Sequence, residues 1–185
     1  MSTGPEGYTT GGSMLGKWNY SAAGAPSSYG DDDETYKRAM SFLDGCGIVE
    51  DWGCGTAYAK KFLKSGIYVG IDGSPSPFTT TVADLRVYRS EAGGILLRHV
   101  LEHNWEWEKI LDNAVASFRK KLVLVFFIPF GPAVQNIGKN WNGVPGLVLR
   151  REDIMKRLKP FGVKEESLET KTQYKQEQIF YVERK

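Results

Sequence analysis

The sequence predicts one α/β domain built around a mainly parallel sheet, and three observations support this fold class. Apolar runs of strand length alternate with segments of helical periodicity along most of the chain. Most of these strands read as continuous apolar runs, which is typical of parallel strands covered on both faces. A chain of 185 residues is also long enough for one domain with a sizeable core. We therefore expect a sheet with helices on both faces.

The helices and strands follow from apolar periodicity and from the residues that interrupt it. Acidic residues at 31–33 can cap a helix that ends before Gly45, because carboxylates favour the first helical turn. Further helices are expected around Tyr58–Phe62, at 105–118 and at 154–161. Seven strands are expected, at 48–49, 67–71, 80–82, 94–97, 122–128, 163–172 and 178–183. The last two alternate polar and apolar residues, so they predict a C-terminal antiparallel hairpin.

Residues 1–30 differ in composition from the rest of the chain. They are rich in Gly, Ser, Thr, Ala and Pro, and such a segment buries little apolar surface. Trp18, Tyr20 and Tyr29 are nevertheless aromatic, which suggests that the segment docks on something. Two interpretations stay open: docking on the domain's own surface, or a lid over an active site. We expect a flexible N-terminal segment at 1–30 and one domain at 31–185.

The charge and cysteine content exclude several classes of protein. The net charge is only +2 and the basic residues are scattered, so nucleic acid is an unlikely partner. The longest apolar run, 122–130, is too short to span a bilayer, and residues 1–16 contain no signal-peptide core. Two cysteines do not make a disulfide scaffold. We expect a cytoplasmic protein without a membrane anchor, and the oligomeric state stays open.

Acidic residues follow three of the expected strands. Asp51, Asp72 and Asp84 each stand at such a position, and ligands of open α/β sheets bind at the carboxyl ends of strands. Asp51 is followed by a turn that contains Gly53 and Gly55, where the backbone can approach a ligand closely. Asp72 comes about 20 residues later, a spacing that suits a carboxylate that accepts both hydroxyls of a ribose. The pattern predicts a nucleoside site.

The same turn excludes the common phosphate-binding motifs. A dinucleotide fingerprint G-x-G-x-x-G would need glycine at the position of Tyr58, and no G-K-[ST] follows the turn. We therefore expect a nucleoside without phosphates.

Several segments of the sequence resemble motifs of the class I S-adenosylmethionine-dependent methyltransferases, which have a Rossmann-like fold. The segment V-E-D-W-G-C-G-T-A at 49–57 resembles the first motif D-x-G-x-G-x-G, with Ala57 in place of the last glycine. The segments V-G-I-D-G-S at 69–74 and V-A-D-L at 82–85 resemble the second and third motifs, whose acids hold the ribose and meet the adenine amino group. The resemblance implies that S-adenosylmethionine is bound by Asp51, Trp52, Gly53, Cys54, Gly55, Asp72, Gly73, Ser74, Asp84, Leu85 and Arg98.

The segment after the fourth strand, I-L-L-R-H-V-L-E-H at 95–103, resembles the small-molecule branch of this family. No D-P-P-Y-like motif follows that strand, as it does in enzymes that methylate a flipped DNA base. We therefore expect methyl transfer to an oxygen or nitrogen of a small-molecule acceptor. The connection at 131–150 either forms a wall of the acceptor pocket or is a surface loop with one buried Trp, and both interpretations stay open.

The two histidines of the chain, His99 and His103, are the candidate catalytic residues. Both follow the fourth strand, beside the expected sulfonium, and a neutral imidazole can remove a proton from the acceptor. In this family the same segment can also be scaffolding. No metal ligand set is expected.

Two alternatives stay open. The fold and the cofactor site can be retained in a binding protein that transfers no methyl group. More remotely, His99, Glu102 and His103 fit the H-x-x-E-H pattern of a zinc-dependent hydrolase, with Glu165 or Glu166 as a further ligand.

Overall fold

Seven strands form one sheet in the order β3-β2-β1-β4-β5-β9-β8 in the computed structural model, which describes residues 18, 33–138 and 144–185. The strands are β1 (Ile48–Trp52), β2 (Ile67–Asp72), β3 (Thr81–Val82), β4 (Gly94–Arg98), β5 (Lys121–Phe126), β8 (Gly162–Glu169) and β9 (Gln176–Glu183). The helices are α1 (Glu34–Leu43), α2 (Trp107–Ser117) and α3 (Arg151–Leu158), with 3-10 turns η1 (Tyr58–Phe62) and η2 (Leu101–His103). The expected α/β fold is confirmed.

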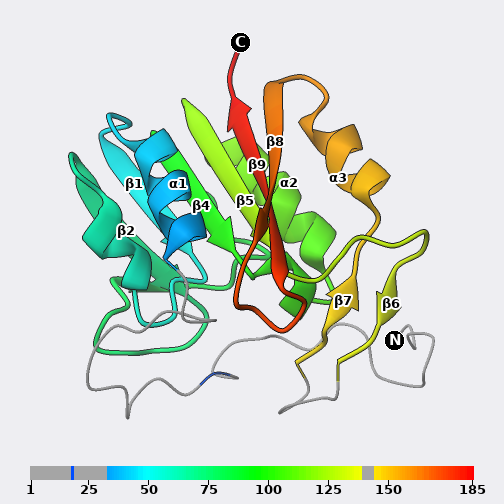
Figure 1. Cartoon of the computed structure of the whole chain (residues 1–185). Coiled ribbons are helices and arrows are strands. Elements are labelled where there is room, and N and C mark those ends of the chain that lie inside the picture. Colours follow the sequence, from blue (N-terminus) through cyan, green and yellow to red (C-terminus); the bar gives the residue numbers. More distant parts are fainter. Residues whose placement is uncertain (1–17, 19–32, 139–143) are drawn as a thin grey trace.

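The first five strands are parallel, so their carboxyl ends meet at one edge of the sheet, the lower edge in Figure 1. The strand order reverses at β1, which pairs with β2 on one side and with β4 on the other. Such a switch point is where open α/β sheets bind ligands. β9 pairs antiparallel with both β5 and β8, which confirms the expected C-terminal hairpin.

Helices cover both faces of the sheet, because successive side chains of each strand point to opposite sides. Val49, Leu96 and Val123 pack on the face of α1, in one buried cluster. On the other face, Ile95 and Leu124 belong to a second buried cluster that includes side chains from α2 and α3. In Figure 1, α1 lies in front of the sheet, and α2 and α3 lie on its other side.

Three local predictions differ from the structure. The segment around Tyr58 is a short 3-10 turn rather than an α-helix, and it follows Ala57, which has a left-handed φ of 56°. Asp33 occupies the N-cap position of α1, but its carboxylate accepts a hydrogen bond from the Tyr58 hydroxyl instead of capping the helix. The connection at 131–150 contains a two-stranded sheet of β6 (Gln135–Asn136) and β7 (Leu147–Val148).

Further expectations concern the N-terminal segment, the membrane and the cysteines. The proposed flexible segment at 1–30 lies outside the described residues apart from Trp18. Within the described part of the chain, no helix has the length and apolar character needed to span a membrane. Cys46 and Cys54 are both buried free thiols.

Candidate functional site

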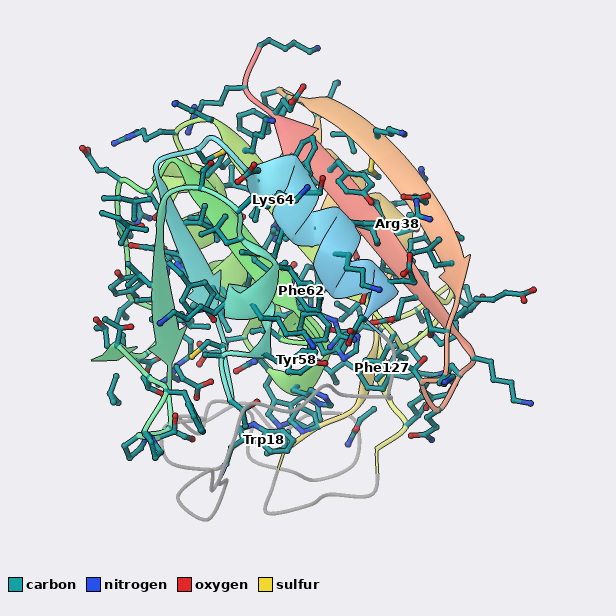
Figure 2. All side chains as sticks on the ribbon, turned by 60° about the vertical axis from the view of Figure 1, so that its left-hand side comes forward. Trp18, Arg38, Tyr58, Phe62, Lys64 and Phe127 are labelled. Atoms are coloured by element: carbon teal, nitrogen blue, oxygen red, sulfur yellow. The ribbon has the colours of Figure 1, made fainter. Side chains whose placement is uncertain are left out.

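A cavity of about 700 Å³ lies at the carboxyl edge of the parallel strands. On the β1–β3 side its wall, which we call the acid half, consists of Asp51, Gly53, Cys54, Asp72, Gly73, Ala83, Asp84 and Leu85. On the β5–β9 side its wall, which we call the aromatic half, consists of Phe127, Ile128, Ile137, Gly138, Val144, Pro145, Gly146, Lys171, Thr172, Gln173 and Tyr174. Between them lie Arg98, His99, Val100, His103 and Asn104, with Trp18, Tyr36 and Ile110. Trp18 and Phe127 lie at this end of the molecule in Figure 2, below α1.

The turn after β1 requires glycine for two reasons. Gly53 has a φ of 78°, and a Cβ atom there would lie 2.5 Å from Cγ2 of Val100. The backbone N–H groups of Gly53 and Cys54 both donate to the Ile71 carbonyl, at 2.7 and 3.1 Å, so the turn is fixed against β2. The result is a turn of fixed backbone conformation on the cavity wall, packed closely against Val100.

The Asp72 carboxylate is held by the backbone on both of its oxygens. The N–H of Gly55 donates to Oδ2 at 2.9 Å, and the N–H of Ser74 donates to Oδ1 at 2.8 Å. Burial raises the pKa of this group, although these backbone hydrogen bonds act in the opposite direction. Asp72 therefore presents a carboxyl group of fixed orientation to the cavity, with lone pairs left over for a ligand.

The other two acids of this half have different surroundings. Burial raises the pKa of Asp51 to about 7, although the Tyr68 hydroxyl donates to its Oδ2 at 2.6 Å. Asp84 forms an ion pair with Arg86, with 2.6 Å between Nη2 and Oδ2, and Arg86 also binds Glu106. Asp51 thus changes charge near neutral pH, whereas Asp84 is part of an ion-pair chain.

Most of the expected cofactor residues line the cavity, and three do not. Trp52 is fully buried in the core and donates from Nε1 to Glu50 at 2.7 Å, so its side chain does not line the cavity. Gly55 and Ser74 lie behind the wall and act through the hydrogen bonds that orient Asp72. The Ser74 hydroxyl also accepts a hydrogen bond from the backbone N–H of Trp18 at 3.1 Å.

Arg98 reaches the cavity, but its guanidinium is bound within the protein. It forms an ion pair with Glu177 of β9 at 2.8 Å and donates to Tyr36 Oη at 2.9 Å and Thr35 Oγ1 at 3.1 Å. The side chains of Arg98 and Glu177 are 4% and 0% exposed. This buried network joins β4 and β9 to α1 and leaves Arg98 in a structural role.

His99 belongs to the same network. Its Nε2 lies 2.5 Å from Glu177 Oε1, and its Nδ1 lies 3.4 Å from Nη1 of Arg98. Burial and the charge of Arg98 lower the pKa of His99 to about 4, so the ring is neutral. A neutral ring has one donor and one acceptor nitrogen, and here both are engaged. His99 therefore has no lone pair available for an acceptor.

The network was missed in the sequence because its central residue, Glu177, stands on a C-terminal strand. Burial raises the pKa of Glu177, but the hydrogen bond from His99 and the charge of Arg98 outweigh this and lower it. One signal was present: Glu177 shares a strand face with Ile179 and Tyr181, which pack against α1. A carboxylate on an apolar strand face indicates a buried partner.

His103 has a different environment, at the end of η2. Its Nδ1 lies 2.9 Å from the carbonyl oxygen of Pro145, which can only accept, so Nδ1 carries the proton. Its Nε2 is then a lone-pair acceptor, and it has no hydrogen-bond partner within residues 18, 33–138 and 144–185. Burial lowers the pKa of His103, so the ring is neutral near pH 7. This is the tautomer and charge state of a general base.

The residues of the zinc alternative are engaged elsewhere. Glu102 is 1% exposed, accepts the N–H of Phe127 at 2.9 Å, and has its pKa raised to about 7 by burial. Glu165 pairs with Arg151 of α3 and Glu166 pairs with Arg38 of α1, on opposite faces of β8. The described part of the chain contains no group of three residues placed to hold a metal ion. These contacts disfavour a zinc-dependent hydrolase.

No protein-family model matches the sequence, and no curated protein sequence matches it. Solved structures do match. Magnesium protoporphyrin IX methyltransferase from Synechocystis PCC 6803, with bound S-adenosylhomocysteine, has a TM-score of 0.61 at 16% identity, over 83% of each chain. Burkholderia thailandensis 1,6-didemethyltoxoflavin-N1-methyltransferase has a TM-score of 0.64 at 14% identity, over 83% of this chain and 79% of that one.

The chain has the fold of the class I methyltransferases. Its mainly parallel seven-stranded sheet with the antiparallel β8–β9 pair is the sheet of this fold. One neighbour has a different activity: the [4+2]-cyclase SpnF has a TM-score of 0.61 at 13% identity, over 89% of this chain and 85% of that one. The methyltransferase fold therefore does not by itself determine the reaction.

Proposed function

We propose that this protein binds S-adenosylmethionine in the acid half of the cavity and transfers its methyl group to a small molecule in the aromatic half. The observation that carries the proposal is the Asp72 carboxyl group, fixed by two backbone N–H groups beside a turn where Gly53 cannot be replaced without a clash. A carboxylate in this position suits the two hydroxyls of a ribose. Structural neighbours with S-adenosylmethionine or S-adenosylhomocysteine bound support this ligand.

The acid half fits this cofactor chemically. S-adenosylmethionine carries a positive sulfonium, and three carboxyl groups line this half. Asp72 would hold the ribose, Asp84 and Leu85 would face the adenine, and Asp51 with the Gly53 turn would adjoin the methionine part. When bound, the cofactor supplies a methyl group that is already activated for transfer. The protein must then align the acceptor and exclude water.

His103 is the general base of this proposal, and His99 is a positioning residue. The Nδ1–H of His103 is held by Pro145, which leaves Nε2 to accept a proton from the acceptor. The ring lies between the two halves of the cavity, where donor and acceptor would meet. His99 instead fixes the end of β4 through Glu177.

One alternative is favoured by a specific finding. The likeness to a [4+2]-cyclase, which has this fold and a different named activity, supports the alternative in which no methyl group is transferred. Binding of the cofactor without transfer to any acceptor would favour it. The cytoplasmic location and the absence of a nucleic-acid partner stay predictions from the sequence.

The test is calorimetric titration of the full chain with S-adenosylmethionine and with S-adenosylhomocysteine. We expect saturable binding of both, and an increase in Kd of about 10²-fold for Asp72→Ala, since hydrogen bonds to charged groups contribute strongly. Asp72→Asn keeps the shape of the side chain, so its Kd should lie between those of the unmodified protein and of Asp72→Ala. The matched control is Asp112→Ala, which removes an exposed carboxylate paired with Arg157 outside the cavity. No binding by the unmodified protein would refute the proposal.

A further inference from the structure

We infer that the methyl acceptor is a flat aromatic or heteroaromatic molecule with an ionisable hydroxyl or ring N–H group. The inference rests on the proposed function and specifies the ligand of the aromatic half. It excludes sugars and other saturated polyols as acceptors.

Phe127 is the centre of the aromatic half. It follows β5, is half-buried, and lies on the cavity wall. Its ring centroid is 5.6 Å from that of His103, 4.6 Å from that of His99 and 6.0 Å from that of Tyr174. Trp18 extends this series, with its ring 5.6 Å from that of His103. The aromatic rings form a continuous series along the cavity, and such surfaces favour offset or edge-to-face contact with another ring.

The connection between β5 and α3 adds aliphatic surface to this half. Ile128, Ile137, Val144 and Pro145 line the cavity beside the aromatic rings. Ile137 is 44% exposed, although it is a large apolar side chain. An apolar ligand would cover it and remove that surface from water, which is favourable in proportion to the area covered.

The two histidines at the boundary are neutral, and the polar side chains of the aromatic half, Lys171, Thr172, Gln173 and Tyr174, all come from the β8–β9 connection, which argues against a polyol or a highly charged acceptor beside His103. His99 and His103 are neutral because burial lowers the pKa of both. Lys171 is the one charged side chain that lines the aromatic half within the described residues. A sugar would bring several hydroxyl groups, and each one left without a partner inside the cavity would weaken binding. A flat ring with one polar edge toward His103 has no such cost.

The position of His103 specifies the reacting group. Its free Nε2 accepts a proton, so the acceptor must present an acidic O–H or N–H at the boundary of the two halves. Aromatic hydroxyls and ring N–H groups ionise more readily than aliphatic alcohols do, so a base with a lowered pKa suffices for them.

The experiment compares aromatic probes with their saturated counterparts on the full chain loaded with S-adenosylhomocysteine. The probes are naphthol with decahydronaphthol, and catechol with cyclohexanediol, each titrated by calorimetry. The members of a pair bury similar area, so hydrophobic burial alone gives them similar Kd values. We expect each aromatic member to bind about tenfold more tightly, from ring contacts that its counterpart lacks.

Two variants test whether Phe127 causes the preference. Phe127→Leu should reduce the preference about 3- to 10-fold, because the aromatic contact is lost while apolar surface is kept. The matched control is Phe42→Leu, the same change at a half-buried ring of α1 that contacts Tyr181 and lies outside the cavity. It should leave the preference unchanged.

The inference is overturned if the saturated probes bind as tightly as the aromatic ones, if neither member of either pair binds, or if Phe127→Leu leaves the preference intact. These results are distinct from failure of the proposed function, because binding of S-adenosylhomocysteine is measured in the same sample before any probe is added. A protein that does not bind that ligand fails the first test and not the second.

Discussion

The acid half and the aromatic half of the cavity differ in what holds their walls in place. In the acid half the backbone does so: peptide N–H groups fix the glycine turn and both oxygens of Asp72. In the aromatic half the wall is made of side chains from segments far apart in sequence, and it depends on β9 through the buried Glu177. A backbone-built wall suits a ligand that does not vary, whereas a side-chain wall can be changed residue by residue. This difference supports the proposal that the cofactor binds in the acid half and the acceptor in the aromatic half.

The largest effect is expected for the residue at the boundary between the halves. In His103→Asn the amide can keep a hydrogen bond to Pro145 but has no lone pair in place of Nε2. We expect kcat to fall by about 10²- to 10⁴-fold, with the Kd of S-adenosylmethionine unchanged. Steady-state assays of S-adenosylhomocysteine release check this, once an acceptor is in hand.

The pH profile of the same assay provides the control. The base is active when unprotonated, so wild-type turnover should fall as the pH drops below the lowered pKa of His103. This acid limb should be absent in the variant. Unchanged turnover in His103→Asn would exclude His103 as the general base between the two halves of the cavity.

A second prediction concerns the buried network that supports the aromatic half. Glu177→Ala leaves the Arg98 charge buried without its partner, so we expect the free energy of unfolding to fall by about 3–5 kcal/mol. Urea denaturation monitored by circular dichroism measures it. Glu165 lies on the neighbouring strand β8 and forms an exposed ion pair with Arg151 of α3. Glu165→Ala should lower the free energy of unfolding by less than about 1 kcal/mol. Equal losses in both variants would mean that the network does not support this wall.

A third prediction tests the backbone of the acid half. Gly53→Ala places a methyl group 2.5 Å from Val100 and requires a φ of 78°, so we expect a loss of about 2 kcal/mol in stability from the strained backbone and the contact together. Thermal unfolding of Gly53→Ala, of Val100→Ala and of the double variant separates the two causes, with the double variant compared to Val100→Ala alone, because Val100 is itself buried in the core. The double variant should recover the contact part only, and full recovery would show that the backbone conformation is not strained.

The smallest effect is a pH dependence of cofactor binding. Asp51 has its pKa raised to about 7, so it is protonated below pH 7 and anionic above it. A cationic ligand prefers the anion, so the Kd should fall about tenfold from pH 6 to pH 8, in proportion to the ionised fraction. Calorimetry at both pH values measures this, with Asp51→Asn as the control that should be independent of pH. If the Kd of the wild-type protein is also the same at pH 6 and pH 8, Asp51 does not contact the cofactor.

The two halves also differ in how far the sequence could predict them. Asp72 binds the N–H groups of residues 17 and 2 positions away, so a local motif was enough to locate the acid half. Glu177 lies 79 positions from Arg98, and Pro145 lies 42 positions from His103. Neither pairing follows from local periodicity. The strands could be predicted for the same reason as the acid half, because most of them are local patterns of continuous or alternating apolar residues.

The position of Trp52 shows what a motif leaves open. The motif specifies the backbone path, but side chains of a strand alternate between faces, and Trp52 points into the core beside Tyr88. The α-helix expected after the turn was wrong for a related reason. The four-residue apolar spacing of Tyr58 and Phe62 is that of an α-helix, but the left-handed Ala57 at the start of the segment is a backbone feature that periodicity does not report.

The position of β9 has a consequence for the order in which the chain can fold. β9 is the last described strand in the sequence, yet it lies inside the sheet, between β5 and β8. During synthesis β8 emerges earlier and has no partner in the sheet until β9 pairs with both neighbours. Until then the edge of β5 is open to pairing with other chains, and Arg98 lacks Glu177. A ribosome-bound chain that stops before residue 176 would therefore expose the unpaired edge of β5 and leave Arg98 without its ion pair.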